Sequence, residues 1–372
     1  MRKYSFLKTR WLLLVGGFDF IGDLFFATRN RQKKLAQSLN KIKKILLIRL
    51  DHIGDGILLT PLVKELRRSF PEAKIHAVFS EEITEVFKES KDLDKIWTLK
   101  RHWFSRRRPC LFSREIFNLL RELRQEKFDV ALDPRGDLRT IFFLGVAQAQ
   151  YRIGYGSSGG GFLLNQELFE KAGEHEIDRN LRLVEVLGIH SYCREASLSP
   201  QSAGQLDGLP KGNYAVIHVG AGTQAKLWPT ERWGKVVRFL SGKDLVVVIV
   251  GKGKIDEEFG LKFGDESKVF NMTGRLSLSQ VWSVIRSAKL FIGCDSGLAH
   301  GAGALGIKTL VLESGSNESE RWGVRGAKVQ VLRYPVFCSP CHLTVCRFPT
   351  HECMMNITEA QVEDAANALL KS

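Results

Sequence analysis

The chain has 372 residues, too many for one ordinary domain core and enough for two domains of about 150 residues each with extensions. Apolar residues make up 44% and charged residues 26%, a balance that excludes a disordered chain and predicts a folded body. The formal net charge of +14 favours anionic partners, which include nucleic acid, an acidic membrane surface and phosphorylated substrates. Seven cysteines are too few for a disulfide scaffold and favour a reducing compartment.

An apolar segment near the N-terminus imitates a signal peptide or a transmembrane helix. Residues 11–28 are largely apolar, but Asp19 and Asp23 interrupt them, and on a helix the two aspartates share one face with Gly16. We therefore expect an amphipathic helix that lies in the membrane interface rather than one that crosses the membrane. The alternative is a helix packed on the protein's own surface.

Basic residues flank this segment on both sides, and each is attracted to anionic headgroups by on the order of 1 kcal/mol. They are Arg2, Lys3, Lys8 and Arg10 before it, and Arg29, Arg31, Lys33, Lys34, Lys41, Lys43 and Lys44 after it. We predict that residues 1–43 form a membrane-associating extension. The protein would then be held peripherally on the cytoplasmic face of the inner membrane, where anionic lipids and positive loops are found.

Strands and helices alternate after the basic segment. Residues 44–50 form a short apolar run typical of a buried parallel strand, and residues 57–70 carry leucines at helical spacing before Pro71. Residues 74–79 then complete a β-α-β unit. Further helices are predicted at residues 116–125 and 179–187, and a further strand at residues 128–132.

A second alternating series follows residues 197–212, a segment rich in Ser, Gly and Pro that is typical of a linker. The strands predicted there are residues 214–219, 245–250, 289–292 and 308–312, with helices at residues 231–240 and 278–288. We predict an α/β protein of two Rossmann-like domains, residues 44–200 and 201–372, whose parallel sheets face a central cleft. Ligands are expected at the carboxyl ends of the strands.

The turn after the predicted strand 289–292 is a candidate phosphate site. Asp295 and Ser296 are natural N-cap residues, and Gly297 lets the backbone approach a ligand closely. The free N–H groups at the start of the following helix suit a diphosphate, which His300 would reach from the first turn. The alternative is a capped helix with a structural histidine.

Two more charged residues follow strands. Lys226 lies in a glycine-containing loop after residues 214–219, where its charge would offset the one that develops on a departing nucleoside diphosphate. Asp55 follows the first strand, where a carboxylate would act as general base on an acceptor hydroxyl. The alternatives are a solvated surface lysine and an aspartate that caps a helix starting at Gly56.

In combination these motifs are more informative than each alone. They are residues 48–55 (IRLDHIGD) followed by Thr60 and Pro61, residues 133–139 (DPRGDLR), residues 152–155 (RIGY), residues 220–229 with Lys-x-Trp-Pro, and Asp295-Ser296-Gly297 with His300. From about residue 44 to residue 362, the chain resembles the glycosyltransferase family 9 heptosyltransferases of lipopolysaccharide inner-core assembly.

The resemblance implies a GT-B fold and an inverting, metal-independent transfer that needs no cofactor. The heptosyl unit would come from ADP-L-glycero-D-manno-heptose and go to a lipid A-core acceptor. By motif, Asp55 corresponds to the family's proposed base and Lys226 to its diphosphate-binding lysine. Donor-binding positions would be Lys226, Glu257 near the ribose, Asp295, Ser296, Gly297, Leu298 and His300.

The sequence departs from the family pattern beside the nucleotide and on the acceptor side. Val219 replaces a proline common in the lysine loop, and residues 312–322 lack the usual Phe-Gly turn, which leaves the donor's base and sugar open. Arg101, beside Trp103 in an inserted basic loop, is a candidate for binding acidic saccharide or lipid headgroups, or else is merely solvated. Arg135 and Arg139 are the other acceptor-binding candidates.

Four cysteines near the C-terminus, Cys338, Cys341, Cys346 and Cys353, fall within sixteen positions. Four thiolates can close a tetrahedral zinc site that ties down a loop, so a structural zinc is one prediction. The spacing matches no standard pair of zinc knuckles, and reduced thiols or paired cysteines are the alternatives.

Two rival functions remain open at this point. One is another GT-B transferase or an epimerase that uses a different nucleotide sugar. The other is a basic nucleic-acid-binding protein, which the net charge suggests. We expect no nucleic-acid partner, because the sequence has no RRM, KH or helix-turn-helix signature and its positive residues concentrate beside the N-terminal apolar segment and in one loop.

Overall fold

The structure, a computed structural model, describes residues 9–27, 42–100, 113–199, 209–210, 212–263 and 266–372. The chain forms two compact units, Met1–Arg194 and Glu195–Ser372, which divide just before the predicted linker at residues 197–212. Each unit is an α/β structure built on one parallel six-stranded sheet. The predicted fold class, α/β with two Rossmann-like halves, is confirmed.

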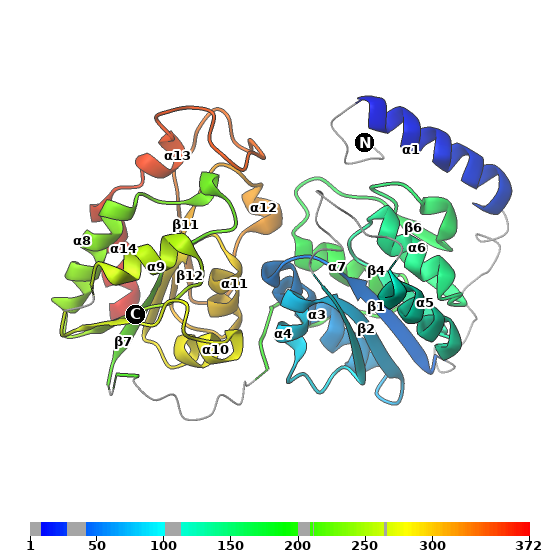
Figure 1. The fold of residues 1–372 in the computed structure, drawn as a ribbon, viewed down its shortest axis with the longest axis horizontal. Coiled ribbons are helices and arrows are strands. Elements are labelled where there is room, and N and C mark those ends of the chain that lie inside the picture. The colour runs from blue at the N-terminus through cyan, green and yellow to red at the C-terminus, as the bar shows by residue number, and fades with distance from the viewer. Residues whose placement is uncertain (1–8, 28–41, 101–112, 200–208, 211, 264–265) are drawn as a thin grey trace. The chain divides into compact units, whose positions relative to one another are not determined.

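The first unit has the strand order β3-β2-β1-β4-β5-β6, with every described pairing parallel. The strands are β1 (Lys44–Arg49), β2 (Lys74–Ser80), β3 (Lys95–Leu99), β4 (Val130–Asp133), β5 (Tyr151–Tyr155) and β6 (Gln166–Leu168). The helices are α3 (Ile53–Ser69), α4 (Glu81–Phe87), α5 (Arg114–Glu126), α6 (Leu138–Val146) and α7 (Glu176–Glu185), with the 3-10 turn η4 (Gly161–Leu163). Helix α3 packs against α4 and α7, and α5 packs against α6, so helices cover both faces of the sheet (Figure 1).

The second unit repeats this topology in the order β12-β11-β10-β7-β8-β9. The strands are β7 (Tyr214–His218), β8 (Val246–Ile249), β9 (Val269–Asn271), β10 (Leu290–Cys294), β11 (Thr309–Glu313) and β12 (Val329–Arg333). The helices are α8 (Thr230–Ser241), α9 (Lys254–Leu261), α10 (Leu278–Arg286), α11 (Gly297–Ala304), α12 (Ser319–Trp322), α13 (Glu352–Met355) and α14 (Glu359–Lys371), with the 3-10 turn η5 (Gln224–Lys226).

In both sheets, the direction in which successive strands are added reverses at the centre. The chain adds two strands on one side of the first strand and then returns to add three on the other side. Strands β1 and β4 are therefore neighbours, as are β7 and β10. Right-handed connections that run in opposite directions from such a pair leave toward opposite faces of the sheet. In doubly wound sheets, the carboxyl ends of such a strand pair are where ligands bind.

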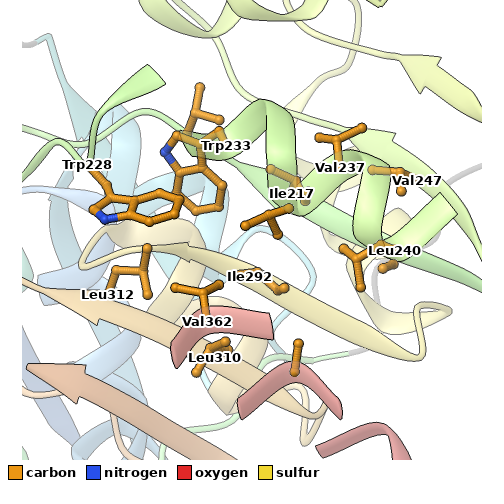
Figure 2. Packing of buried hydrophobic residues seen from close by; sticks show 14 of the residues in the cluster. Ile217, Trp228, Trp233, Val237, Leu240, Val247, Ile292, Leu310, Leu312 and Val362 are labelled. Carbon is orange, nitrogen blue, oxygen red and sulfur yellow. The ribbon is translucent and has the colours of Figure 1, made fainter. Parts of the chain in front are cut away.

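The core of the second unit shows why these residues form strands and helices. Figure 2 shows Trp233 and Leu240 of α8 packed over Ile292 of β10, with Trp228 beside them. The rings of Trp228 and Trp233 meet edge to face at 5.1 Å between centroids. Each fully buried side chain of this size stabilises the fold by about 1.5–3 kcal/mol, so the apolar face of α8 accounts for its position on the sheet.

One predicted boundary was wrong, and several strands were not predicted. Helix α3 begins at Ile53, before the predicted start, because His52 and Asp55 form a capping box that allows the first turn to start earlier. The edge strands β3, β6, β9 and β12 were not predicted, since their partly exposed residues lack a long continuous apolar run. The interior strand β5 was also not predicted, because Arg152 and Gly154 interrupt its apolar residues.

The N-terminal helix α1 (Thr9–Gly22) continues into a π-helical turn, η1 (Asp23–Ala27), and both contact η4. Asp19 is only 2% exposed, and its Oδ1 accepts a hydrogen bond from the backbone N–H of Gly160 at 2.7 Å. The aspartate that was expected on a polar face therefore points into the protein. Within the described residues, no helix is both long and apolar enough to cross a membrane.

We expect Leu240→Ala to destabilise the second unit by about 2–5 kcal/mol, because truncation leaves a cavity in a core where Leu240 is fully buried. Urea unfolding followed by circular dichroism measures this change. Leu261→Ala, at an exposed site on α9, is the matched control and should change stability little. Equal effects of the two substitutions would contradict the packing described here.

Candidate active site

In the second unit, helix α11 begins directly after the central strand β10. The Ser296 hydroxyl caps the helix by accepting a hydrogen bond from the N–H of Ala299 at 3.4 Å. The helix is rich in glycine and alanine because it lies close to its neighbours: a Cβ at Gly301 would overlap the ring of Trp282. The expected capped helix is confirmed: it starts at Gly297, and His300 lies in its first turn.

Lys226 meets the start of this helix. Its Nζ lies 2.6 Å from Oδ2 of Asp295, although the two residues are 69 positions apart in the chain. Nε2 of His300 lies 3.7 Å from the other carboxylate oxygen, Oδ1. Lys226 is mostly buried, so the alternative of a solvated surface lysine is wrong. Three of the predicted donor-binding residues are thus brought together.

His218 ends β7 and faces the same helix start. Its Nδ1 lies 3.2 Å from the Ser296 hydroxyl, and its Nε2 lies 3.7 Å from Oδ1 of Asp256. Burial lowers the pKa of His218 to about 4, so the imidazole is neutral near pH 7. Nδ1 is then able to accept the Ser296 O–H, which orients the cap.

Asp256 fixes the loop that leads to Lys226. Its carboxylate accepts the N–H of Gly220 at 2.9 Å, and burial raises its pKa to about 6. A side chain on Gly220 would run into this carboxylate, so the glycine is required for the close approach. The Asp256 contact therefore positions the segment that carries Lys226.

Two more of the predicted donor-binding residues, and one carboxylate that was not predicted, belong to the second unit. Glu257 lies in the first turn of α9, where its carboxylate accepts the N–H of Gly253 at 3.2 Å, and no described hydrogen bond or ion pair joins it to Lys226 or Asp295. The side chain of Leu298 is buried. Glu313, at the end of β11, is buried beside Arg333 at 3.4 Å, and burial followed by the charge of Asp295 raises its pKa.

In the first unit, a buried arginine at the end of β1 forms ion pairs with three carboxylates. The Arg49 guanidinium lies 2.8 Å from Asp55, 2.6 Å from Asp51 and 3.1 Å from Glu176. Burial alone would lower the pKa of Arg49, but the three carboxylates outweigh burial and raise it. The guanidinium stays charged and holds Asp55 in place.

Ion pairs also join the end of β1 to the end of β4, the central strand pair of the sheet. Nη1 of Arg135 lies 2.6 Å from Oδ1 of Asp51, and the same atom also donates to the backbone oxygen of Leu50. Asp137 lies 3.5 Å from Arg135 and 2.7 Å from Arg139. The two predicted acceptor-binding arginines therefore lie at the expected sheet edge, each already paired with a carboxylate. Arg101 lies outside the described residues.

Asp55 makes both of its described contacts within this network. Oδ1 accepts from Arg49, and Oδ2 accepts from the backbone N–H of His52 at 3.2 Å. The capping role is confirmed, although the cap belongs to a helix that starts at Ile53. A role as general base stays a prediction.

The four C-terminal cysteines are near one another and carry free thiols. After burial, the neighbouring Cys341, Cys353 and Cys346 raise the pKa of Cys338. Among the residues that the structure describes, no three or more His, Cys, Asp or Glu side chains are arranged to hold a metal ion. A structural zinc that draws the four sulfurs together therefore stays a prediction from the sequence.

The comparison with known families decides the class of this site. The sequence model of glycosyltransferase family 9 (heptosyltransferase) matches residues 116–351, which include Arg135, Lys226 and Asp295. The chain belongs to glycosyltransferase family 9. It is therefore a glycosyltransferase, and the strand and helix order described above is the GT-B fold of this family.

Several heptosyltransferases are similar to this chain in sequence or in fold. Lipopolysaccharide heptosyltransferase 3 of Escherichia coli K12 is 24% identical over 276 residues, covering 70% of this chain and 78% of that protein. The E. coli ADP-heptose lipopolysaccharide heptosyltransferase II structure has a TM-score of 0.70 at 20% identity, covering 88% and 98% of the two chains. E. coli heptosyltransferase WaaC, solved with ADP-2-deoxy-2-fluoro heptose, has a TM-score of 0.67 at 18% identity, covering 87% and 99%.

Several residues of this family 9 site were not assigned from the sequence. Arg49 was readable as a lone charge in an otherwise apolar strand, and Glu313 as a carboxylate at the end of one. Glu176 carried no such signal, since 127 positions separate it from Arg49. Asp256 was hidden because only the folded loop brings it to Gly220.

We expect acid to destabilise the second unit through His218. Its pKa lies near 4 in the fold and near 6.5 when exposed, so between these values the unfolded chain binds the extra proton. The stability that His218 contributes near neutral pH is therefore lost as the pH falls through 6.5, by on the order of 2 kcal/mol between about pH 7 and pH 5.

Thermal unfolding followed by circular dichroism at the two pH values measures this loss. His218→Asn should lose less stability on acidification than the unsubstituted chain, whatever its stability at neutral pH. His190→Asn, at an exposed histidine, should leave the pH dependence unchanged. Asp256 acts in the opposite direction but is common to all three proteins. The same loss in the unsubstituted chain and in His218→Asn would exclude a buried neutral imidazole.

Proposed function

We propose that this family 9 protein transfers a heptosyl unit from ADP-L-glycero-D-manno-heptose to a lipid A-core acceptor of lipopolysaccharide. The observation that carries the proposal is the ion pair of Lys226 with Asp295 at the start of α11. It lies at the end of the central strand pair β7 and β10, where the order of strand addition reverses. A heptosyltransferase solved with an ADP-heptose analogue shares this fold and supports the choice of donor. Transfer would take place at the cytoplasmic face of the inner membrane.

The second unit would bind the donor. A helix start with free N–H groups and a nearby lysine suits a diphosphate, because both place positive charge where the leaving group becomes more negative. Lys226 is held by Asp295 and its loop is held by Asp256, so its ammonium is in place before the donor arrives. This preorganisation lowers the cost of stabilising the departing ADP.

The first unit would bind the acceptor. In the proposed step, the carboxylate of Asp55 takes the proton from an acceptor hydroxyl while that oxygen attacks the anomeric carbon, and the bond to ADP breaks. Attack on the face opposite the leaving group inverts the anomeric centre. Arg135 and Arg139 would attract the acidic groups of the acceptor, and the proposed step uses no metal.

Asp55→Asn should lower kcat about 10²–10⁴-fold while leaving the affinity for ADP nearly unchanged, because the amide cannot take up the proton. Transfer is measured by mass spectrometry of the product, and ADP binding by calorimetry. Asp178→Asn, which removes another carboxylate paired with an arginine in the same unit, is the matched control and should retain activity. Near-normal turnover in Asp55→Asn would remove Asp55 from the mechanism.

Unlike Asp55→Asn, Lys226→Ala should reduce ADP affinity, about tenfold or more, because a charge-assisted contact to the diphosphate is lost. Lys235→Ala is the control: Lys235 also pairs with a carboxylate in this unit, at 2.8 Å from Glu359, but it lies on the surface. Equal ADP affinity in both variants would show that the diphosphate binds elsewhere. A screen of other nucleotide sugars in the same assay tests the choice of donor.

A further inference from the structure

The outer face of α1 and η1 is apolar. Phe20, Ile21, Leu24 and Phe25, which we call the apolar ridge, have side chains between 58% and 72% exposed. Their spacing places them on adjacent turns of one helical face. Single exposed apolar residues are ordinary on protein surfaces, but four large ones in six positions form a patch of the kind that marks an interaction site.

The helix is oriented so that it buries its acid and exposes its phenylalanines. Asp19 is enclosed against Gly160, while Val15 is buried on the same side. The ring of Phe18 packs edge to face on Phe162 at 5.3 Å between centroids. A helix that only covered the protein's own core would turn its apolar side inward and its carboxylate to water. The buried Asp19 contact therefore holds the apolar ridge on the outer side of the helix.

The loop beneath the helix is shaped to hold it this way. Gly159 and Gly160 have φ values of 95° and 84°, which side chains rarely tolerate. A Cβ on Gly159 would overlap Val15, and one on Gly160 would press on Leu138. Because these two glycines bring the Gly160 N–H to Asp19, the docking contact is specific, and it fixes which side of the helix faces out.

The charges in the sequence identify the occupant of this surface. Four basic residues precede the ridge within the first ten positions, and seven more follow it by residue 44. Exposed phenylalanine and leucine side chains between basic flanks are the features of helices that lie in the interface of an anionic bilayer. A partner protein with an acidic rim would not require so many phenylalanines, and no described helix is able to span the bilayer.

We propose that the apolar ridge inserts into the headgroup region of an anionic lipid bilayer and that the Asp19–Gly160 contact holds the first unit against that surface. The inference rests on the proposed function only for its purpose, since an acceptor anchored by lipid A is presented in a membrane. The ridge brings the acceptor-binding unit to the membrane independently of the chemistry.

Vesicle sedimentation of the full chain tests the ridge without any nucleotide sugar. The unsubstituted protein should bind vesicles that contain phosphatidylglycerol and bind phosphatidylcholine vesicles far more weakly. Leu24→Ser combined with Phe25→Ser should raise the lipid concentration needed for half-maximal binding about tenfold or more. Leu261→Ser combined with Phe337→Ser, at sites 74% and 84% exposed in the second unit, should leave it unchanged.

Equal vesicle binding by the ridge variant and its control would overturn the proposal, as would a ridge variant that only converts dimers to monomers in light scattering. Transfer assays separate this result from the proposed reaction. The ridge variant should keep its activity on a delipidated core oligosaccharide and lose it on acceptor embedded in vesicles. If no heptosyl transfer occurs with any acceptor, the proposed function fails while the vesicle result stands.

Discussion

The rest of the structure depends on one constraint: at the centre of each parallel sheet, the direction in which successive strands are added reverses. Because β1 lies beside β4 and β7 beside β10, residues far apart in the sequence end at one sheet edge. Parallel strands end with their carbonyl groups and loops on the same side, and the loops diverge only at this one strand pair. Both charge clusters, around Asp51 with Arg135 and around Asp295 with Lys226, lie there.

The two clusters offset the free-energy cost of burying charge in different ways. In the first unit, one enclosed guanidinium serves three carboxylates, so removing Arg49 would leave several like charges together. In the second unit, burial lowers the pKa of His218 and keeps its imidazole neutral near pH 7, while Lys226 and Asp295 offset each other's charge as an ion pair.

Much of this arrangement could be predicted because local signals agree with the fold. Asp55, Lys226 and Asp295 follow apolar runs of strand length, so the sequence alone places them at the carboxyl edge. The pairing of Arg49 with Glu176 could not be predicted, because it depends on the packing of α7 against α3. The orientation of α1 was also hidden, since spacing shows which residues share a face but not which face meets Gly160.

The pair of Lys226 with Asp295 also affects which anions this site admits. One of the three donors of the Lys226 ammonium meets a carboxylate at 2.6 Å, so part of its charge is offset before any anion arrives. A free phosphate ion brings little besides its charge to this partly neutralised site. A molecule that adds contacts through a base and a sugar does not depend on that charge alone. We therefore expect the internal ion pair to weaken the binding of small anions more than the binding of a nucleotide.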